Sequence, residues 1–218
     1  MPYKLYNRIG SGGFVVEAAL ALGGVEFERI EIASKPATAL PETFRDVNPW
    51  RQVPVLILPD GTMMTETAAI LIYLATLKSD GELGPRTATP EYAALLRWLV
   101  FLSVNVYEAT LRRIYPQRYT SDAEGADGVS LAARQRGNEA FALLDAELQS
   151  REFLVGEQMS VGDVYLAMLF AWHPERDGRA RCQALTHRVA AHPIVAPIWQ
   201  RHFDHRLAVK WGRETPEL

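Results

Sequence analysis

The chain has only one cysteine, Cys182, among its 218 residues, so a disulfide within the chain is excluded and a reducing compartment is favoured. Long apolar runs are also lacking. The longest, Val164 to Trp172, is far short of the roughly 20 residues needed to span a bilayer and predicts a buried helix. The first residues lack the apolar segment of a secretory signal. We therefore expect a cytoplasmic protein with no membrane partner.

Excess positive charge is absent as well. The chain carries 23 Lys and Arg against 26 Asp and Glu, a net charge of −3, and no basic block interrupts it, which argues against a nucleic-acid partner. His202 and His205 are three residues apart but have no evident third ligand, so we expect no metal site. No Cys-x-x-Cys pair exists, which excludes dithiol redox chemistry by the protein itself.

The first 80 residues predict a small α/β domain. Apolar periodicity and turn signals give a strand, a helix, a strand, a short helix, a hairpin and a last helix. In order, the expected elements span residues 3–6, 14–22, 27–32, 41–47, 55–58 with 62–64, and 67–77. This order is the thioredoxin-like pattern, with a right-handed crossover between its first two strands.

The remaining chain predicts only helices. Residues 81–89 change composition abruptly and are expected to form a linker, which leaves residues 1–80 as the first domain and 90–218 as an all-helical second domain. Pro90 suits the first turn of a long helix that runs towards Tyr115. Ser130 is expected to cap the next helix, and Ser160 to open a central apolar one together with Asp163. Two shorter helices are expected around residues 181–191 and 193–203.

One stretch of the first domain, residues 48–70, combines several unusual features. Val53-Pro54 comes immediately before an apolar strand, where proline is tolerated because it need not donate to the sheet. Glu66-Thr67 opens the helix that follows the hairpin. Helix N-termini leave N–H donors and partial positive charge, so Thr67 can hold a carboxylate there, while Glu66 can hold an ammonium group.

In this order and spacing, the stretch resembles the glutathione-binding half of the glutathione S-transferase superfamily. The resemblance implies that the Val53–Pro54 bond is cis and that the main chain of Val53 pairs with the cysteinyl backbone of glutathione. It also implies that Glu66 and Thr67 bind the γ-glutamyl end. Residues 154–163, Leu-Val-Gly-Glu-Gln-Met-Ser-Val-Gly-Asp, match the capping segment of the family's helical domain, with Gly162 where alanine is usual.

The family also implies roles for neighbouring residues. Gln52 stands where the family binds the glycyl end of glutathione. Arg51 stands where the family often has glycine, and it either pairs with the glycyl carboxylate or is a solvated loop charge. In the loop after the first strand, Ser11 matches the place of the group that stabilises the thiolate. A donor at a helix N-terminus favours the anion of a thiol whose ordinary pKa is about 8.5. Gly13 removes a possible second donor.

Other interpretations of the Gly10-Ser11-Gly12-Gly13 loop fail. A dinucleotide fingerprint would need glycine in place of Val15, and a nucleophile elbow would need glycine in place of Ile9. Ser11 can also be a simple helix cap.

The second substrate is expected between the two domains, the usual place for a small-molecule cleft. Its candidate lining residues are Tyr107, Leu111, Ile114 and Trp172. The beta-like members of the family have a histidine in place of Tyr107 and a cysteine near Ser11, so the chain is not a close copy of that class.

We therefore expect a homodimeric glutathione transferase that conjugates the glutathione thiolate to small hydrophobic electrophiles, as in detoxification. Two alternatives remain open. One is a glutathione-dependent peroxide or disulfide reductase. The other is a transferase-like binding protein without turnover.

Overall fold

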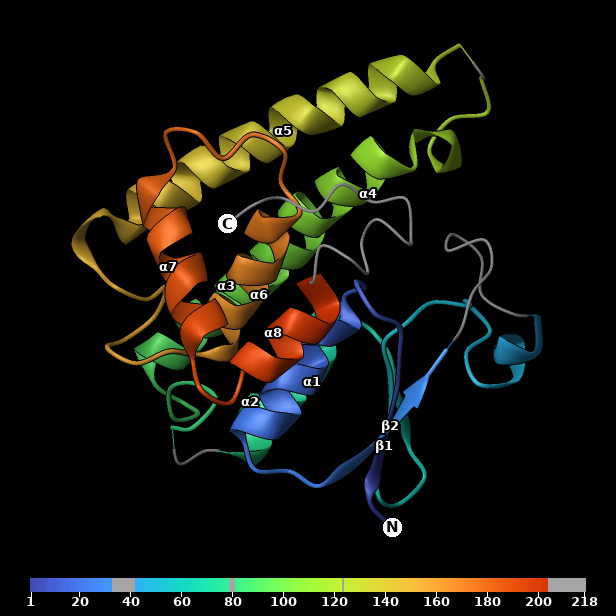
Figure 1. Cartoon of the computed structure of the whole chain (residues 1–218), viewed down its shortest axis with the longest axis vertical. Helices are drawn as coiled ribbons and strands as arrows, with labels where there is room; N and C mark the ends of the chain where they lie inside the picture. Colours follow the sequence, from blue (N-terminus) through green and yellow to red (C-terminus); the bar gives the residue numbers. More distant parts are fainter. Residues whose placement is uncertain (33–41, 79–80, 123, 204–218) are drawn as a thin grey trace. The chain divides into compact units, whose positions relative to one another are not determined.

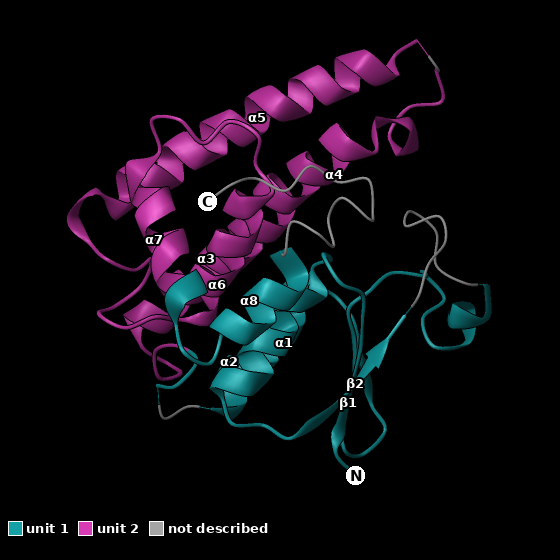
Figure 2. Ribbon diagram, viewed as in Figure 1, with its two compact units in different colours: residues 1–83, 190–215 teal, residues 84–189, 216–218 magenta. Residues whose placement is uncertain are grey.

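A computed structural model describes residues 1–32, 42–78, 81–122 and 124–203 (Figure 1). The chain forms two compact units (Figure 2). Unit 1 contains residues 1–83 and the described residues from 190 onward, and unit 2 contains residues 84–189.

Unit 1 is built on a four-stranded mixed sheet. Its strands are β1 (Tyr3–Asn7), β2 (Phe27–Glu31), β3 (Val55–Ile57) and β4 (Met63–Met64), in the order β2-β1-β3-β4. β1 and β2 are parallel, and the other two pairs are antiparallel. The predicted thioredoxin-like pattern is confirmed.

Three helices of unit 1 lie side by side on one face of this sheet (Figure 1): α1 (Gly13–Leu22), α2 (Thr67–Leu77) and α8 (Ala196–Phe203). Every residue of α1 from Gly13 to Leu20 is buried, because this helix packs between the sheet and the other two helices. Glu17 is the only charge on it. A 3₁₀ turn, η1 (Glu42–Asp46), stands where a short helix was expected, and residues 33–41 lie outside the described residues. From the sequence we expected the last helix in the second domain, whereas α8 belongs to unit 1.

The described residues of unit 2 form helices joined by loops, with no strand among them. Its α-helices are α3 (Pro90–Phe101), α4 (Glu108–Ile114), α5 (Ala126–Glu147), α6 (Val161–Ala171) and α7 (Ala180–Ala191). Two 3₁₀ turns, η3 (Pro116–Arg118) and η4 (Leu148–Ser150), come before and after α5. All eleven residues of α6 are buried, and the capping box of Ser160 and Asp163 opens it, as predicted. The fold is that expected: a thioredoxin-like domain and a helical one.

One local prediction for unit 2 was wrong, and one helix has an internal irregularity that the sequence did not indicate. Ser130 does not cap α5, which begins at Ala126; its hydroxyl instead donates to the carbonyl oxygen of Arg113 at 3.1 Å. The long helix from Pro90 runs to Ile114, as predicted, but residues Leu102–Tyr107 within it form a π-helix, η2. Its wider turn shifts the faces of the helix, and apolar periodicity alone does not reveal such a shift.

Candidate functional site

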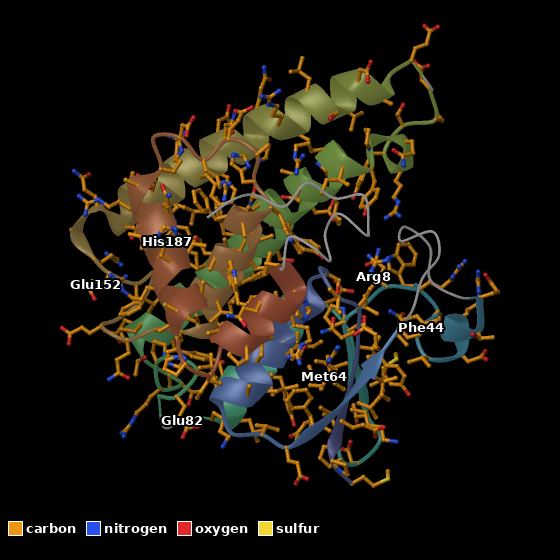
Figure 3. All side chains as sticks on the ribbon, viewed as in Figure 1. Arg8, Phe44, Met64, Glu82, Glu152 and His187 are labelled. Atoms are coloured by element: carbon orange, nitrogen blue, oxygen red, sulfur yellow. The ribbon has the colours of Figure 1, made fainter. Side chains whose placement is uncertain are left out.

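The register of the sheet brings the three predicted glutathione-binding segments of unit 1 to one end of it. β3 runs antiparallel to β1 with Val55 opposite Tyr6, so Val53-Pro54 lies beside the loop that follows Asn7. β4 returns antiparallel with Met64 opposite Leu56, so Glu66-Thr67 lies at this same end. The Ser11 loop precedes the other two segments by more than 40 residues in the chain, yet all three lie at one end of the sheet. Figure 3 labels Arg8 and Met64 next to two of these segments.

The Val53–Pro54 bond is cis, as predicted, and Pro54 is buried. The core beneath it joins Phe44 and Val55, with the ring of Tyr6 6.0 Å from that of Phe44. Buried packing therefore holds this segment in place.

Gln52 and Arg51, the two residues before Val53, differ in their exposure and in their partners. Gln52 is exposed, and its carbonyl oxygen accepts a hydrogen bond of 2.8 Å from Asn48. Arg51 has a left-handed φ of 55° and pairs with Glu42 at 3.0 Å. A glycyl carboxylate at Arg51 would have to compete with Glu42, so the two roles predicted for Arg51 both stay open.

The start of α2 has the features of an anion site. Glu66 is exposed and has a φ of 63°, a conformation that persists in non-glycine residues only where the surroundings impose it. Thr67 is buried to 9% exposure. The side chain of the N-cap residue, Glu66, makes no capping hydrogen bond, so it leaves the first-turn N–H groups of this helix to solvent or a ligand.

Ser11 is placed at the N-terminus of α1, as predicted, but its hydroxyl points inward. The hydroxyl oxygen lies 2.7 Å from the carbonyl oxygen of Arg8 and 3.1 Å from Oδ1 of Asn7, and it accepts from the N–H of Gly13 at 3.3 Å. The residue is only 7% exposed. With one hydrogen, the hydroxyl can donate to one acceptor at a time, so a bound sulfur would compete with Arg8 and Asn7.

Asn7 explains why residue 13 is glycine. A Cβ placed on Gly13 would lie 1.8 Å from Oδ1 of Asn7, so any side chain at 13 would displace the carboxamide. Asn7 is fully buried; it accepts from the N–H of Arg8 at 2.7 Å and donates to Glu17 at 3.1 Å. The carboxamide therefore occupies the space where a side chain of residue 13 would otherwise lie.

Glu17 is the centre of a buried polar cluster that sequence reasoning missed. Its carboxylate accepts from Arg201 at 2.6 Å and from His202 at 3.0 Å, and it lies 3.5 Å from Arg29. Burial raises the pKa of Glu17, but the hydrogen bond from His202 and the charges of Arg201 and Arg29 outweigh it and hold the pKa below its ordinary value. The available signal was a lone carboxylate in the otherwise apolar helix Gly13–Leu22.

The predicted second-substrate residues all belong to unit 2. Tyr107 closes the π-helix, and its ring lies 5.7 Å from that of Trp172. Leu111 and Ile114 follow on α4, and Ile114 is 44% exposed. Their role in substrate binding stays a prediction.

A groove of about 570 Å³ on unit 2 is lined by other residues. They are Val104, Asn105, Ala109, Arg112, Tyr119, Val129, Ala132, Ala133 and Arg136. Among the described residues, no three His, Cys, Asp or Glu side chains gather as a metal site would require. His202 binds Glu17, and His205 lies outside the described residues.

With this geometry in place, sequence comparison assigns both halves of the chain. The glutathione S-transferase N-terminal domain matches residues 15–77, and the glutathione S-transferase C-terminal domain matches residues 117–201. The chain belongs to the glutathione S-transferase superfamily.

Two curated relatives illustrate the range of proteins to which the chain is similar. The uncharacterized GST-like protein YncG of Escherichia coli K12 is 26% identical over 91% of the chain and 98% of its own length. Elongation factor 1-gamma of Trypanosoma cruzi is 33% identical over 78% of the chain, which spans only 39% of that protein.

Two solved structures are similar over nearly their whole length. A beta-class glutathione S-transferase of Sphingomonas chungbukensis has a TM-score of 0.77 and 29% identity, covering 90% of this chain and 97% of that one. A sphingomonad glutathione S-transferase complexed with glutathione has a TM-score of 0.77 and 26% identity, with the same coverage.

Proposed function

We propose that this glutathione S-transferase family member binds glutathione at the end of the sheet where the Ser11 loop, Val53-Pro54 and Glu66-Thr67 meet. The sheet register that brings these segments together carries the proposal. The exposed carboxylate of Glu66 suits the ammonium of the γ-glutamyl end, and the uncapped start of α2 at Thr67 suits its carboxylate. A sphingomonad relative has been solved with glutathione bound, which supports this ligand.

The reaction we propose is conjugation. The thiol of bound glutathione loses its proton to solvent, and the thiolate sulfur bonds to an electrophilic carbon. A halide then leaves with its electron pair, or an epoxide oxygen opens and takes a proton from water. The N-terminus of α1 favours the anion, and the hydroxyl of Ser11 adds a donor once it turns from Arg8 towards the sulfur.

A calorimetric titration with glutathione tests the binding step. We expect Thr67→Ala to weaken affinity about 10- to 100-fold, as expected for losing a hydrogen bond to a charged group of about 1.5–3 kcal/mol. Thr62→Ala, in the exposed turn of the hairpin, is the matched control and should bind as the parent does. Equal affinity of the two variants would remove the γ-glutamyl assignment.

A turnover screen tests the reaction class. Aryl halides, epoxides, peroxides and mixed disulfides are offered to the parent with glutathione. We expect conjugation of aryl halides or epoxides. Activity confined to peroxides or mixed disulfides would instead assign the glutathione-dependent reductase.

A second candidate function is glutathione binding without turnover. The inward hydroxyl of Ser11 favours it, because that donor is already committed to Arg8 and Asn7. The similarity to an elongation factor is consistent with a non-catalytic role. Tight glutathione binding with no turnover in the screen would select this candidate.

We also propose a homodimer. The family resemblance implies pairing through the helix after Thr67 and the first long helix, and exposed apolar side chains lie on both: Leu77 on α2, at 48% exposure, and Val100 on α3, at 49%. Sedimentation at micromolar concentration should give twice the 24.4 kDa of one chain. A single species of one chain's mass would contradict it.

A further inference from the structure

The last described helix of the chain reaches the loop that carries Ser11. The N–H of Gly10 donates to Nδ1 of His202 on α8 at 3.2 Å, across a separation of 192 residues. His202 is 5% exposed, and its ring meets that of Phe14 edge-on at 5.4 Å. The contact is therefore partly buried within unit 1, with the His202 side covered and Gly10 of intermediate exposure.

The two ring nitrogens of His202 have different hydrogen-bonding partners, which determines which of them carries the hydrogen. Nε2 lies 3.0 Å from Oε2 of Glu17. Because Nδ1 accepts the hydrogen of Gly10, Nε2 must carry the ring hydrogen and donate it to the carboxylate. Glu17 is held in turn by Arg201 and Asn7, so the orientation of the ring is imposed from two sides.

Ser11 follows Gly10 directly, so this bond bears on the position of its backbone. The preceding N–H, that of Ile9, donates to Glu31 at 2.9 Å. On the other side, the carbonyl oxygen of Ser11 accepts from Phe14 in α1 at 3.1 Å. The bonds of Ile9 and Gly10 and the start of α1 therefore hold the loop on both sides of Ser11.

We propose that His202 is a positioning residue: its Nδ1 accepts from the N–H of Gly10 and thereby holds the backbone of the Ser11 loop. The proposal rests on the proposed function, in which this loop holds the sulfur of glutathione. A purely structural role would join α8 to α1, as Trp199 and Phe203 already do around Phe14. The positioning role depends on Nδ1, which accepts from Gly10, whereas a structural role depends on ring packing and on the bond of Nε2 to Glu17.

Two substitutions separate the two nitrogens. In His202→Asn, the amide oxygen can replace Nδ1 as the acceptor for Gly10, but the bond to Glu17 is lost. In His202→Gln, the longer amide can replace Nε2 as the donor to Glu17, but the acceptor for Gly10 is lost. Phe203→Leu is the control, because it weakens the packing of α8 without touching either bond.

The first measurement is amide hydrogen exchange of the ligand-free protein. We expect the amide of Gly10 to exchange about tenfold faster in His202→Gln than in the parent, and at nearly the parent rate in His202→Asn and Phe203→Leu. Equal rates in His202→Gln and the parent would overturn the proposal. The nitrogen chemical shifts of the ring in the parent need no variant: a ring protonated at Nδ1 at neutral pH would overturn it as well.

The second measurement is the pKa of the bound glutathione thiol, with kcat and KM. We expect His202→Gln to lower kcat about fivefold, with KM for glutathione within twofold and the thiol pKa raised. His202→Asn should restore both values. Equal losses in the two variants would assign His202 a structural role only. A parent that never ionises glutathione would refute the proposed function, and with it the positioning role, whereas the exchange rates would still report whether the bond to Gly10 exists.

Discussion

Replacing Glu17 by alanine tests the buried cluster of unit 1. The carboxylate of Glu17 accepts hydrogen bonds from Asn7 and His202, which are 0% and 5% exposed. Without it, each donor stays buried with no acceptor, at a cost of about 1–3 kcal/mol. The side chains of Arg201 and Arg29 are 40% and 22% exposed and can turn to water. We expect Glu17→Ala to lower the free energy of unfolding by about 3–5 kcal/mol, the range for breaking a buried ion pair.

Thermal and urea unfolding at fixed protein concentration measure this loss. For a chain of this length, the expected loss corresponds to a decrease in Tm of roughly 6–20 °C. Glu28→Ala is the matched control, because the side chain of Glu28 is 55% exposed and meets Lys4 at 3.8 Å. Its stability should stay within about 0.5 kcal/mol of the parent.

The pH profile gives a second test of Glu17. Its pKa in the folded protein lies below the ordinary value, so its stabilising contribution is present above about pH 4.5 and is lost as the pH falls through the lowered pKa. When the pH is lowered below about 4.5, the free energy of unfolding should therefore decrease less in Glu17→Ala than in the parent. A variant as stable as Glu28→Ala, or one with the acid profile of the parent, would refute this reasoning.

Two further predictions concern Ser11 and His173. Ser11→Ala should raise the pKa of the bound glutathione thiol by about one unit and lower turnover at pH 6.5 about 10- to 100-fold, with affinity changed only a few-fold; parent-like turnover would move the donor role elsewhere. Burial, then the charge of Arg113, lowers the pKa of His173 from 6.5 to about 4. As the pH falls, His173 is therefore protonated in the unfolded chain before it is protonated in the folded one, and stability should decrease from about pH 6.5 to about pH 4. His173→Gln should show a shallower decline there in urea unfolding, and an unchanged slope would contradict the assignment.

The parts of the fold that could be predicted are those determined by local pattern. The strands of unit 1, the hairpin at Pro59-Asp60-Gly61 and the capping box of Ser160 follow from alternation, turn chemistry and capping within a few residues. The start of α5 at Ala126 could not be predicted, because by sequence Ser130 is as good a cap as any residue before Ala126. In the structure, Ser130 donates to the carbonyl oxygen of Arg113 instead. A choice between two such starts depends on tertiary contacts.

The site was predictable only in part for the same reason. The family pattern located Ser11, Val53-Pro54 and Thr67, and the sheet brings them together. The direction of the Ser11 hydroxyl depends on Asn7 occupying the space beside Gly13, which no spacing in the sequence shows. The hydrogen bond that His202 donates to Glu17 joins residues 185 apart in the chain, so only the fold reveals it.

Thiolate absorbance of glutathione mixed with the parent protein tests the central claim most directly. A bound thiolate absorbs in the ultraviolet, so a titration from pH 5 to 10 gives the pKa of the bound thiol against that of free glutathione. If the Ser11 loop, Val53 and Thr67 form a glutathione site that favours the anion, ionisation should be half complete at least one pH unit below that of free glutathione, whose thiol has an ordinary pKa of about 8.5. A titration curve identical to that of free glutathione, at protein concentrations that saturate binding, would contradict the account.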